Sequence, residues 1–202
     1  MSSLTNREEP AWLRQALDIV ERGLVVALPF EYLFGLAANA LDARAVDRVA
    51  AIKDRHPGNA GNKPISVILP NWGSLGLVTH NLPPLARRLA KSFWPGPLTL
   101  VVPAAQGLPR QLVSESGLIG VRLPGPCAAK ILAEQSGQIL TATSANRSDE
   151  PNVCCHKDLA GLKGIELIVE GRVQGGVGST VVDASGKRPI VLRQGSVDIG
   201  QG

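Results

Sequence analysis

Apolar residues recur along this chain with two different spacings, and stretches of the two kinds alternate. Leu13, Ala16, Leu17 and Val20 stand three and four positions apart, which places them on one face of a helix. Residues 24–28 form an unbroken apolar run, which is typical of a strand buried on both faces. Similar patterns predict helices over residues 43–53 and 83–93, and strands over residues 65–69, 98–102, 118–123, 138–140, 165–169, 180–183 and 190–193.

The order of these elements predicts the fold class. Helices and strands follow one another without a repeat or a long linker, and 202 residues suffice for one large core. We therefore expect residues 1–202 to form a single α/β domain, in which helices flank a twisted sheet of mixed parallel and antiparallel strands. Thr5 and Glu8 have the spacing of a capping box and predict where the first helix begins.

Composition narrows the classes of protein that fit. The chain is 44% hydrophobic and 19% charged, as in ordinary globular proteins. Aromatic residues make up only 3%, so Leu, Val, Ile and Ala must supply the core. The net charge of +4 suits an anionic small molecule or an RNA surface, and it requires neither.

We expect a cytoplasmic protein without a membrane span. The most apolar window, residues 23–41, is interrupted by Pro29, Glu31 and Gly35. The first ten residues lack the apolar core of a secretory signal, and three cysteines do not make a disulfide framework. The stretch Cys154-Cys155-His156 lacks the ligand spacing of a zinc site, so no protein metal site is expected.

Several common catalytic motifs are absent from the sequence. The glycine-rich stretch from Gly175 to Thr180 lacks the lysine of a P-loop. There is no Gly-x-Ser-x-Gly elbow of a serine hydrolase, and the three histidines stand apart. The chemistry must therefore come from other side chains.

A polar segment, TATSANRSDEPN at residues 141–152, follows a predicted strand. Its hydroxyl and amide side chains are more numerous than a turn requires: Thr141, Thr143, Ser144, Asn146 and Ser148. Open α/β folds bind ligands at the ends of strands, and such side chains would serve there as short hydrogen-bonding arms. The alternative is a loop that only caps the next helix.

Cations beside predicted loops and inside strands are the other candidates. Lys53 and Arg55 can reach the same phosphate chain, although two solvated charges at a helix C-terminus would also be favourable. Arg122 and Arg193 lie within apolar strands, where a charge needs a partner or an anionic ligand. Trp94 is interpreted as a packing residue rather than a stacking platform.

Eight short motifs follow one another in the order found in YrdC-like proteins. They are LPFEYLFGL (28–36), KDR (53–55), KPIS (63–66), FWPGPLT (93–99), VRLP (121–124), TSAN (143–146), STVVD (179–183) and LRQG (192–195). Each motif alone is weak. On all eight together the chain resembles the YrdC-like family, and the resemblance extends over about residues 24–195.

The resemblance implies a YrdC-like fold with a concave, positively charged groove, and the activity of an L-threonylcarbamoyladenylate synthase. In that reaction L-threonine and bicarbonate form an N-carboxylated amino acid, whose carboxylate attacks the α-phosphate of ATP and releases pyrophosphate. The product serves threonylcarbamoylation of the tRNA adenosine next to the anticodon. The implied ligands are ATP with its Mg²⁺, L-threonine and bicarbonate. The further partners it suggests are tRNA or double-stranded RNA, and other tRNA threonylcarbamoylation proteins.

The resemblance also implies residue roles. It places Lys53 and Arg55 on the nucleotide phosphates as the catalytic cations. The nucleotide side would be completed by Ser144, Asn146, Asn152 and Arg193. The amino-acid side would be formed by Phe30, Tyr32, Arg122, Thr143, Ser179 and Thr180, with Arg122 holding the carboxylate. Nucleotidyl transfer relies on positioning and charge neutralisation, so the lack of a covalent nucleophile agrees with this activity.

The chain departs from the family pattern at three places. The family usually has small hydroxyls where Phe30 and Tyr32 stand, and a tyrosine at Phe34. Alternation along the chain would place Phe30 and Tyr32 on one side and Glu31 on the other, and two rings there would reshape the amino-acid pocket. Asp149 adds charge near the phosphates, and the loop over residues 53–64 is longer than usual.

Two alternatives to a threonine enzyme remain. One is a divergent relative that adenylates another carbamoyl-type acid. The other is a non-catalytic RNA-binding module that uses the basic groove. The retained cations and small polar side chains disfavour the module, because RNA binding requires diffuse charge rather than this constellation.

Overall fold

The computed structural model describes residues 10–55, 63–148 and 150–200 of the chain. Thr5 and Glu8, the predicted capping box, lie outside these residues. So do Asp149 and most of the long loop that follows Arg55.

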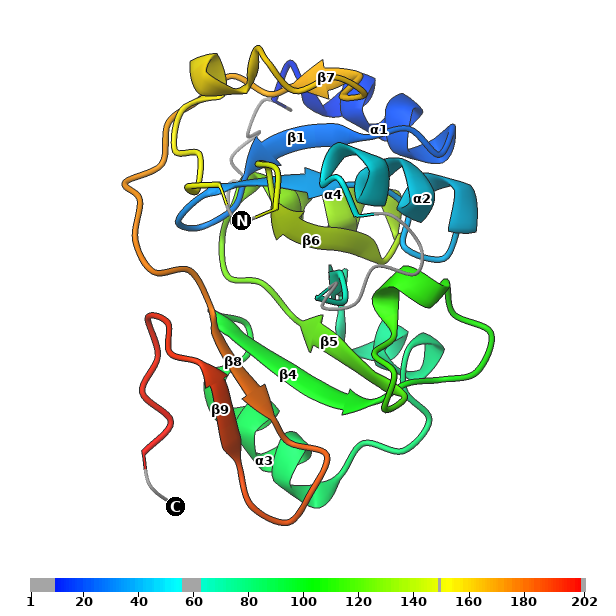
Figure 1. The fold of residues 1–202 in the computed structure, drawn as a ribbon, viewed down its shortest axis with the longest axis vertical. Coiled ribbons are helices and arrows are strands. Elements are labelled where there is room, and N and C mark those ends of the chain that lie inside the picture. Colours follow the sequence, from blue (N-terminus) through cyan, green and yellow to red (C-terminus); the bar gives the residue numbers. More distant parts are fainter. Residues whose placement is uncertain (1–9, 56–62, 149, 201–202) are drawn as a thin grey trace, which may run out of the picture.

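One sheet organises the described part of the chain (Figure 1). It contains nine strands in the order β7-β1-β2-β6-β3-β5-β4-β8-β9. The strands are β1 (Val26–Pro29), β2 (Phe34–Ala37), β3 (Ser66–Ile68), β4 (Leu98–Pro103), β5 (Leu118–Arg122), β6 (Leu140–Ser144), β7 (Leu167–Ile168), β8 (Thr180–Asp183) and β9 (Ile190–Arg193).

The sheet is mixed, as predicted. The pairs β1–β7, β3–β5 and β4–β8 are parallel, whereas β1–β2, β2–β6, β3–β6, β4–β5 and β8–β9 are antiparallel. Strand β6 pairs with β2 on one side and with β3 on the other. It therefore joins the two halves of the sheet, and the side chains along it lie near the middle of the molecule.

Helices cover the sheet on both faces. Helix α1 (Leu13–Glu21) packs against α4 (Ala128–Ser136) on one core, and α2 (Ala43–Ile52) and α3 (Pro84–Phe93) contribute to the other. Short 3₁₀ helices complete the elements: η1 (Trp72–Leu77), η2 (Arg110–Leu112) and η3 (His156–Leu159).

The sequence of β1 is apolar throughout because both faces of this strand are buried. Val26 and Leu28 are buried in the core under α1 and α4, whereas Ala27 is buried in the core on the opposite face. Alternate side chains of one strand thus enter different cores, and each core requires an apolar residue. The prediction of a strand buried on both faces is confirmed.

Two elements were missed by the periodicity, and one boundary was wrong. Strand β2 is only four residues long and contains Gly35, and α4 carries a short apolar stripe that ends at Gly137, in the left-handed conformation at φ 67°. Strand β6 begins at Leu140, where the predicted strand ended. Thr141, Thr143 and Ser144 therefore belong to a strand rather than to the loop after it.

The elements divide into two halves in Figure 1. Strands β1, β2, β6 and β7 lie in the upper half with α1, α2 and α4, and β4, β5, β8 and β9 lie in the lower half with α3. Residues 169–179 run along one side from β7 to β8. Among the described residues, no helix combines the length and apolarity needed to cross a membrane.

Candidate functional site

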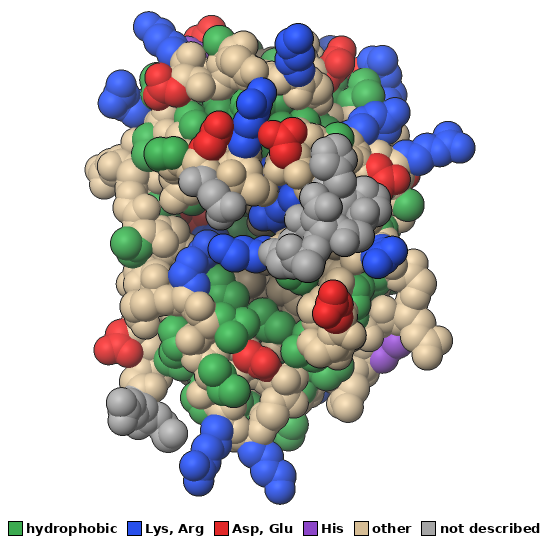
Figure 2. Space-filling model, viewed as in Figure 1, with side chains coloured by type: hydrophobic (Ala, Val, Ile, Leu, Met, Phe, Trp, Pro, Cys, Tyr) green, Lys and Arg blue, Asp and Glu red, His purple; other side chains and the backbone are tan. Residues whose placement is uncertain are grey.

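A cavity of about 960 Å³ lies between the two halves of the sheet. Five cations line it, namely Lys53, Arg55, Lys63, Arg122 and Arg193, together with the acids Glu31, Glu150 and Asp183. Figure 2 shows Lys and Arg side chains gathered at the centre of this face. The larger number of cations favours an anionic ligand.

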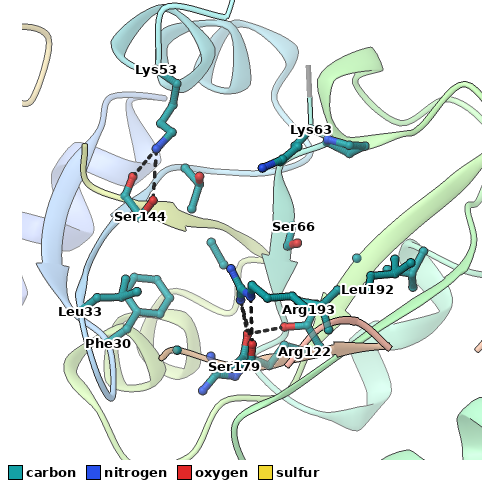
Figure 3. A pocket seen from close by; sticks show the side chains of 18 of the residues that line it. Phe30, Leu33, Lys53, Lys63, Ser66, Arg122, Ser144, Ser179, Leu192 and Arg193 are labelled. Atoms are coloured by element: carbon teal, nitrogen blue, oxygen red, sulfur yellow. Dashed lines mark hydrogen bonds between the residues drawn. The ribbon is translucent and has the colours of Figure 1, made fainter. Parts of the chain in front are cut away.

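Lys53 follows the last turn of α2 and is only 2% exposed. Its Nζ donates to the Ser144 carbonyl oxygen at 2.8 Å and to Ser144 Oγ at 3.2 Å (Figure 3). It also donates to the Asn146 carbonyl oxygen at 2.8 Å and to Asn146 Oδ1 at 2.6 Å. These four contacts fix the ammonium at the end of β6 and order that segment. The structure thus joins two motifs that are 90 residues apart in the sequence.

Arg55 lies beside this network at the cavity wall. Its Nη1 donates to the Lys63 carbonyl at 2.6 Å, and its Nε donates to Ser148 Oγ at 3.3 Å. Ser148 Oγ in turn donates to the Lys53 carbonyl at 2.8 Å. Hydrogen bonds of Lys53 and Arg55, the two cations predicted to bind the nucleotide, therefore connect the segment after α2 to the end of β6 and the segment after it.

Arg193 at the end of β9 approaches the cavity from the lower half. Its Nη2 donates to the Ser179 carbonyl at 2.8 Å and to Ser179 Oγ at 3.1 Å (Figure 3). Burial lowers the pKa of Arg193, and the neighbouring charge of Arg122 lowers it further. Two guanidinium groups that repel each other across a cavity create a region in which an anion is stabilised.

A β-bulge in β9 sets the direction of Arg193. Val182 pairs with Val191 and Val181 pairs with Arg193, so Leu192 is the extra residue between the two pairs. Residues paired across antiparallel strands share a face, and Val181 lines the cavity. The bulge thus places Arg193 on the cavity face of the sheet.

Arg122, the last residue of β5, is 7% exposed and has a protein partner. Its Nη2 forms an ion pair with Glu31 Oε1, and its Nε donates to the Gly96 carbonyl at 2.9 Å. The positive charge of Arg122, which was expected to need a partner or an anionic ligand, is therefore paired at least in part with the carboxylate of Glu31. Glu31 itself was not among the candidate site residues, although an acid two residues after a strand was a visible signal.

Residues 30–33 form the turn of the β1–β2 hairpin, closed by a hydrogen bond of 2.9 Å from Phe30 N to the Leu33 carbonyl. The alternation expected here is wrong, because the strand ends at Pro29 and all four turn residues line the cavity. Phe30 is 6% exposed and its ring covers Gly35, where a Cβ would overlap it. The ring of Tyr32 lies at 3.4 Å from the position of a Cβ on Gly176. The two aromatic residues therefore have different neighbours.

The remaining candidates divide between the cavity and the interior. Thr143, Asn152 and Ser179 line the cavity together with Ser144 and Asn146. Thr180 does not, because its buried hydroxyl donates to the Val197 carbonyl at 2.6 Å and accepts from Gly195 N at 3.0 Å. Thr180 thus fixes the C-terminal segment, and this site role is not supported by its position.

Trp94 packs in the interior, as expected. It is 7% exposed, its Nε1 donates to the Leu98 carbonyl at 2.7 Å, and its ring lies 5.4 Å from that of Trp72. The sequence also missed the lower wall of the cavity, which is formed by Val101, Ser114, Ser116, Leu118, Val181, Asp183 and Leu192. Those residues come from four strands and one loop. Val181, Asp183 and Leu192 lie within two of the quoted motifs, but the motifs did not indicate that these side chains line the cavity.

Metal-ligand chemistry is not evident in the described part of the chain. No group of three or more His, Cys, Asp or Glu side chains there could hold a metal ion. Cys127 lies near the ion pair, and burial, followed by the charge of Glu31, raises its pKa from 9.0 to about 12. Its thiol is therefore protonated at neutral pH and is not an activated nucleophile.

The mixed sheet and the cavity define an α/β protein with a cation-lined cavity between the two halves of one sheet. The family model Sua5_yciO_yrdC, described as "Telomere recombination", matches residues 18–195, and the chain belongs to this family. The family predicted from the eight motifs is thereby confirmed.

Curated relatives carry a common name. The chain is 35% identical over 200 residues to threonylcarbamoyl-AMP synthase of Pyrococcus abyssi, covering 98% of this chain and 58% of that protein. It is 32% identical over 188 residues to threonylcarbamoyl-AMP synthase of Vibrio cholerae, covering 91% of this chain and 97% of that protein. The chain therefore spans little more than half of the first relative and nearly all of the second.

Solved structures agree with the fold. The crystal structure of P. abyssi Sua5 complexed with L-threonine matches with a TM-score of 0.85 at 34% identity, over 94% of this chain and 57% of that one. E. coli YciO matches with a TM-score of 0.81 at 24% identity, over 95% and 92% of the two chains, and this likeness supports the fold alone. The predicted α/β fold with a mixed sheet is confirmed.

Proposed function

We propose that this protein is a threonylcarbamoyl-AMP synthase, which joins an amino acid, bicarbonate and ATP into a carbamoyl adenylate and releases pyrophosphate. The observation that carries the proposal is the cavity, in which the Lys53 network and the Arg122–Arg193 pair face each other from the two halves of the sheet. The names of the relatives and the threonine complex of P. abyssi Sua5 support it.

The residues suggest a division of labour during the reaction. Arg55 and Arg193 neutralise the phosphates of ATP, and Lys53 holds Ser144 and Asn146 in place beside them. Arg122 binds the carboxylate of the amino acid. The reacting carboxylate and the α-phosphate are both anions, so bringing them together is the main barrier, and fixed cations lower it without covalent catalysis.

The ligands follow from this reaction. ATP enters with Mg²⁺ bound to its phosphates, and bicarbonate supplies the carboxyl group. The product would be passed on for threonylcarbamoylation of tRNA in the cytoplasm, with tRNA and other proteins of that modification as candidate partners. The cavity cations provide the charge that RNA contact would need, without base-reading elements of their own.

A second candidate is the same chemistry on a different amino acid. Phe30, Tyr32 and Leu33 line the cavity, so apolar surface stands beside Arg122 at the position where the family usually carries small hydroxyls. A site that lacks hydroxyl partners discriminates less well in favour of a hydroxyl-bearing substrate. Of the two rings, Tyr32 is the less buried and therefore the better one to alter.

One experiment tests both candidates. The protein is incubated with ATP, Mg²⁺, bicarbonate and each amino acid in turn, while pyrophosphate release and the adenylate are followed. We expect amino-acid-dependent release, and about tenfold higher kcat/KM for threonine in Tyr32→Thr than in the unmodified protein. Absence of release with every amino acid contradicts the proposed function. If the unmodified protein turns over threonine as well as Tyr32→Thr does, or better, the altered specificity is contradicted and the proposed function is not.

A further inference from the structure

Glu31 and Arg122 form an ion pair in the cavity wall that is mostly shielded from water. The side chain of Arg122 is 9% exposed and that of Glu31 is 12% exposed. Glu31 Oε1 also accepts a hydrogen bond of 2.9 Å from Gly125 N. The hairpin turn after β1 and the end of β5 are thus fastened together at one charged contact.

The pair does not use all of its hydrogen-bonding groups. Among the described residues, Arg122 donates through Nε to Gly96 and through Nη2 to Glu31, and none accepts from Nη1. Glu31 Oε2 is buried and likewise has no partner among the described residues. A buried carboxylate oxygen without a donor is costly, and such groups in folded proteins usually have a ligand or another explanation.

One donor group of Arg122 and one buried acceptor oxygen of Glu31 therefore remain unused on two residues that line the cavity. An α-amino acid presents the complementary arrangement, because its carboxylate and its amine are attached to the same carbon atom. The last torsion of a glutamate side chain is broad, so the carboxylate can turn Oε2 toward the cavity without movement of the backbone. The two unused groups match the two polar groups of an amino-acid head.

We propose that Glu31 and Arg122 together form the head-group site for the α-amino acid. Arg122 Nη1 donates to the carboxylate of the amino acid, and Glu31 Oε2 accepts a hydrogen bond from its amine. The inference rests on the proposed function for the presence of an amino-acid substrate, and it adds Glu31 as a binding residue. When the amine has become a carbamate, its nitrogen keeps one N–H, so the contact with Glu31 persists.

The charge of Glu31 also affects which ligand binds at this end of the cavity. Arg122 alone would attract any anion, including the phosphates of ATP. Paired with Glu31 it forms a neutral unit, which accepts a zwitterion and disfavours a polyanion. Arg55 lines the same cavity, and so does Arg193, which forms no ion pair with an acid that the structure describes. The phosphates are therefore directed away from the amino-acid end.

The test compares amino acids with analogues that lack only the amine. Binding of L-threonine and of 3-hydroxybutanoate is measured by NMR titration in the unmodified protein and in Glu31→Gln. L-alanine and propanoate form a second pair, in which the side chain is too small to clash with Phe30 or Tyr32. Glu170→Gln, an exposed glutamate outside the cavity, is the matched control.

We expect the unmodified protein to prefer each amino acid over its analogue by tenfold or more. Glu31→Gln should weaken amino-acid binding about tenfold and leave the analogues within twofold, and Glu170→Gln should change neither. Glu31→Asp keeps the charge and should retain part of the preference, which a purely structural role would not predict.

Equal affinity for amino acid and analogue in the unmodified protein overturns the inference, and this holds even if Glu31→Gln fails to fold. Equal weakening of both ligands in Glu31→Gln also overturns it, because Glu31 would then act only by holding Arg122. A preference for the amino acid without any pyrophosphate release supports the head-group site and contradicts the proposed function instead.

Discussion

Both ends of the cavity are lined by cations, but the cations at the two ends have different partners. At the Lys53 end, the ammonium is almost fully buried and donates to four neutral oxygens of Ser144 and Asn146. At the opposite end, Arg122 has an acidic partner, and its Nη1 donates to none of the described residues. The guanidinium of Arg193 donates to Ser179 and to no other described residue. The comparison teaches that one cation mainly builds the site, whereas the others are positioned to bind in it.

The largest expected effect comes from Lys53→Met. Removing the ammonium leaves the buried oxygens of Ser144 and Asn146 without a donor, so the free energy of unfolding should fall by about 3 kcal/mol. Synthase turnover should fall about 100-fold or more, because the end of β6 is no longer ordered. Urea unfolding and pyrophosphate release measure the two effects.

Lys157→Met serves as the control, because Lys157 is exposed in η3. It should change neither quantity appreciably. If Lys53→Met lost turnover while its unfolding free energy stayed within about 0.5 kcal/mol of the unmodified protein, Lys53 would be a direct ligand contact, and the contrast between the two ends would be broken.

A smaller and more selective effect is expected for Arg193→Ala. ATP affinity should fall about tenfold, which corresponds to about 1.4 kcal/mol for one charge-assisted contact. The free energy of unfolding should change less than in Lys53→Met, since Arg193 lies in the exposed edge strand β9. Calorimetry of ATP binding with Mg²⁺ checks the affinity, and Arg188→Ala in the exposed turn before β9 is the control.

Unchanged ATP affinity in Arg193→Ala would show that this arginine only fixes Ser179. Failure of the unmodified protein to bind ATP, with or without Mg²⁺, would remove the nucleotide from the proposed function altogether.

The smallest effect concerns Cys127 beside the Glu31–Arg122 pair. Because burial and Glu31 raise its pKa from 9.0 to about 12, the folded state keeps the thiol protonated where the unfolded state loses the proton. The contribution of this thiol to the free energy of unfolding is fully present below pH 9.0, and it is lost as the pH rises toward 12. Urea unfolding at pH 8 and pH 10 should show a greater loss for the unmodified protein than for Cys127→Ala.

Glu31→Gln sharpens this measurement. Removing the second cause of the shift should bring the pKa of Cys127 closer to 9.0, and alkylation of the thiol at pH 10 should become faster. Alkylation at the same rate in both proteins would mean that the charge of Glu31 does not reach Cys127.

Local patterns predicted the elements that have strong periodicity or long apolar runs. Helices α1, α2 and α3 and most strands were found because each buries a regular face. The hairpin strand β2 and helix α4 were missed, since four residues with a glycine, or a weak stripe of alanines, carry little periodic signal. These two elements are specified mainly by the tertiary contacts that cover them.

The site was predictable as a set of residues and not as an arrangement. Motif positions identified Lys53, Arg122, Ser144, Asn146 and Arg193 as members of one cavity, and the structure places all five in it. Their partners were not predictable, because the contact between Arg122 and Glu31 spans 91 residues and that between Lys53 and Asn146 spans 93. The resemblance placed Thr180 on the amino-acid side together with Ser179, although neighbouring residues of an extended chain face opposite sides.

The bulge at Leu192 decides which face of the sheet Arg193 occupies. Regular pairing over the present length of β9 would place Leu192 opposite Val181, and Arg193 would then share the face of the buried Thr180. Deleting Leu192 would remove the bulge and leave Arg193 opposite Val181, whereas straightening the strand at its present length would turn the arginine away from the cavity. Genetic variation that suppresses the bulge in this edge strand should therefore act through activity rather than through protein level.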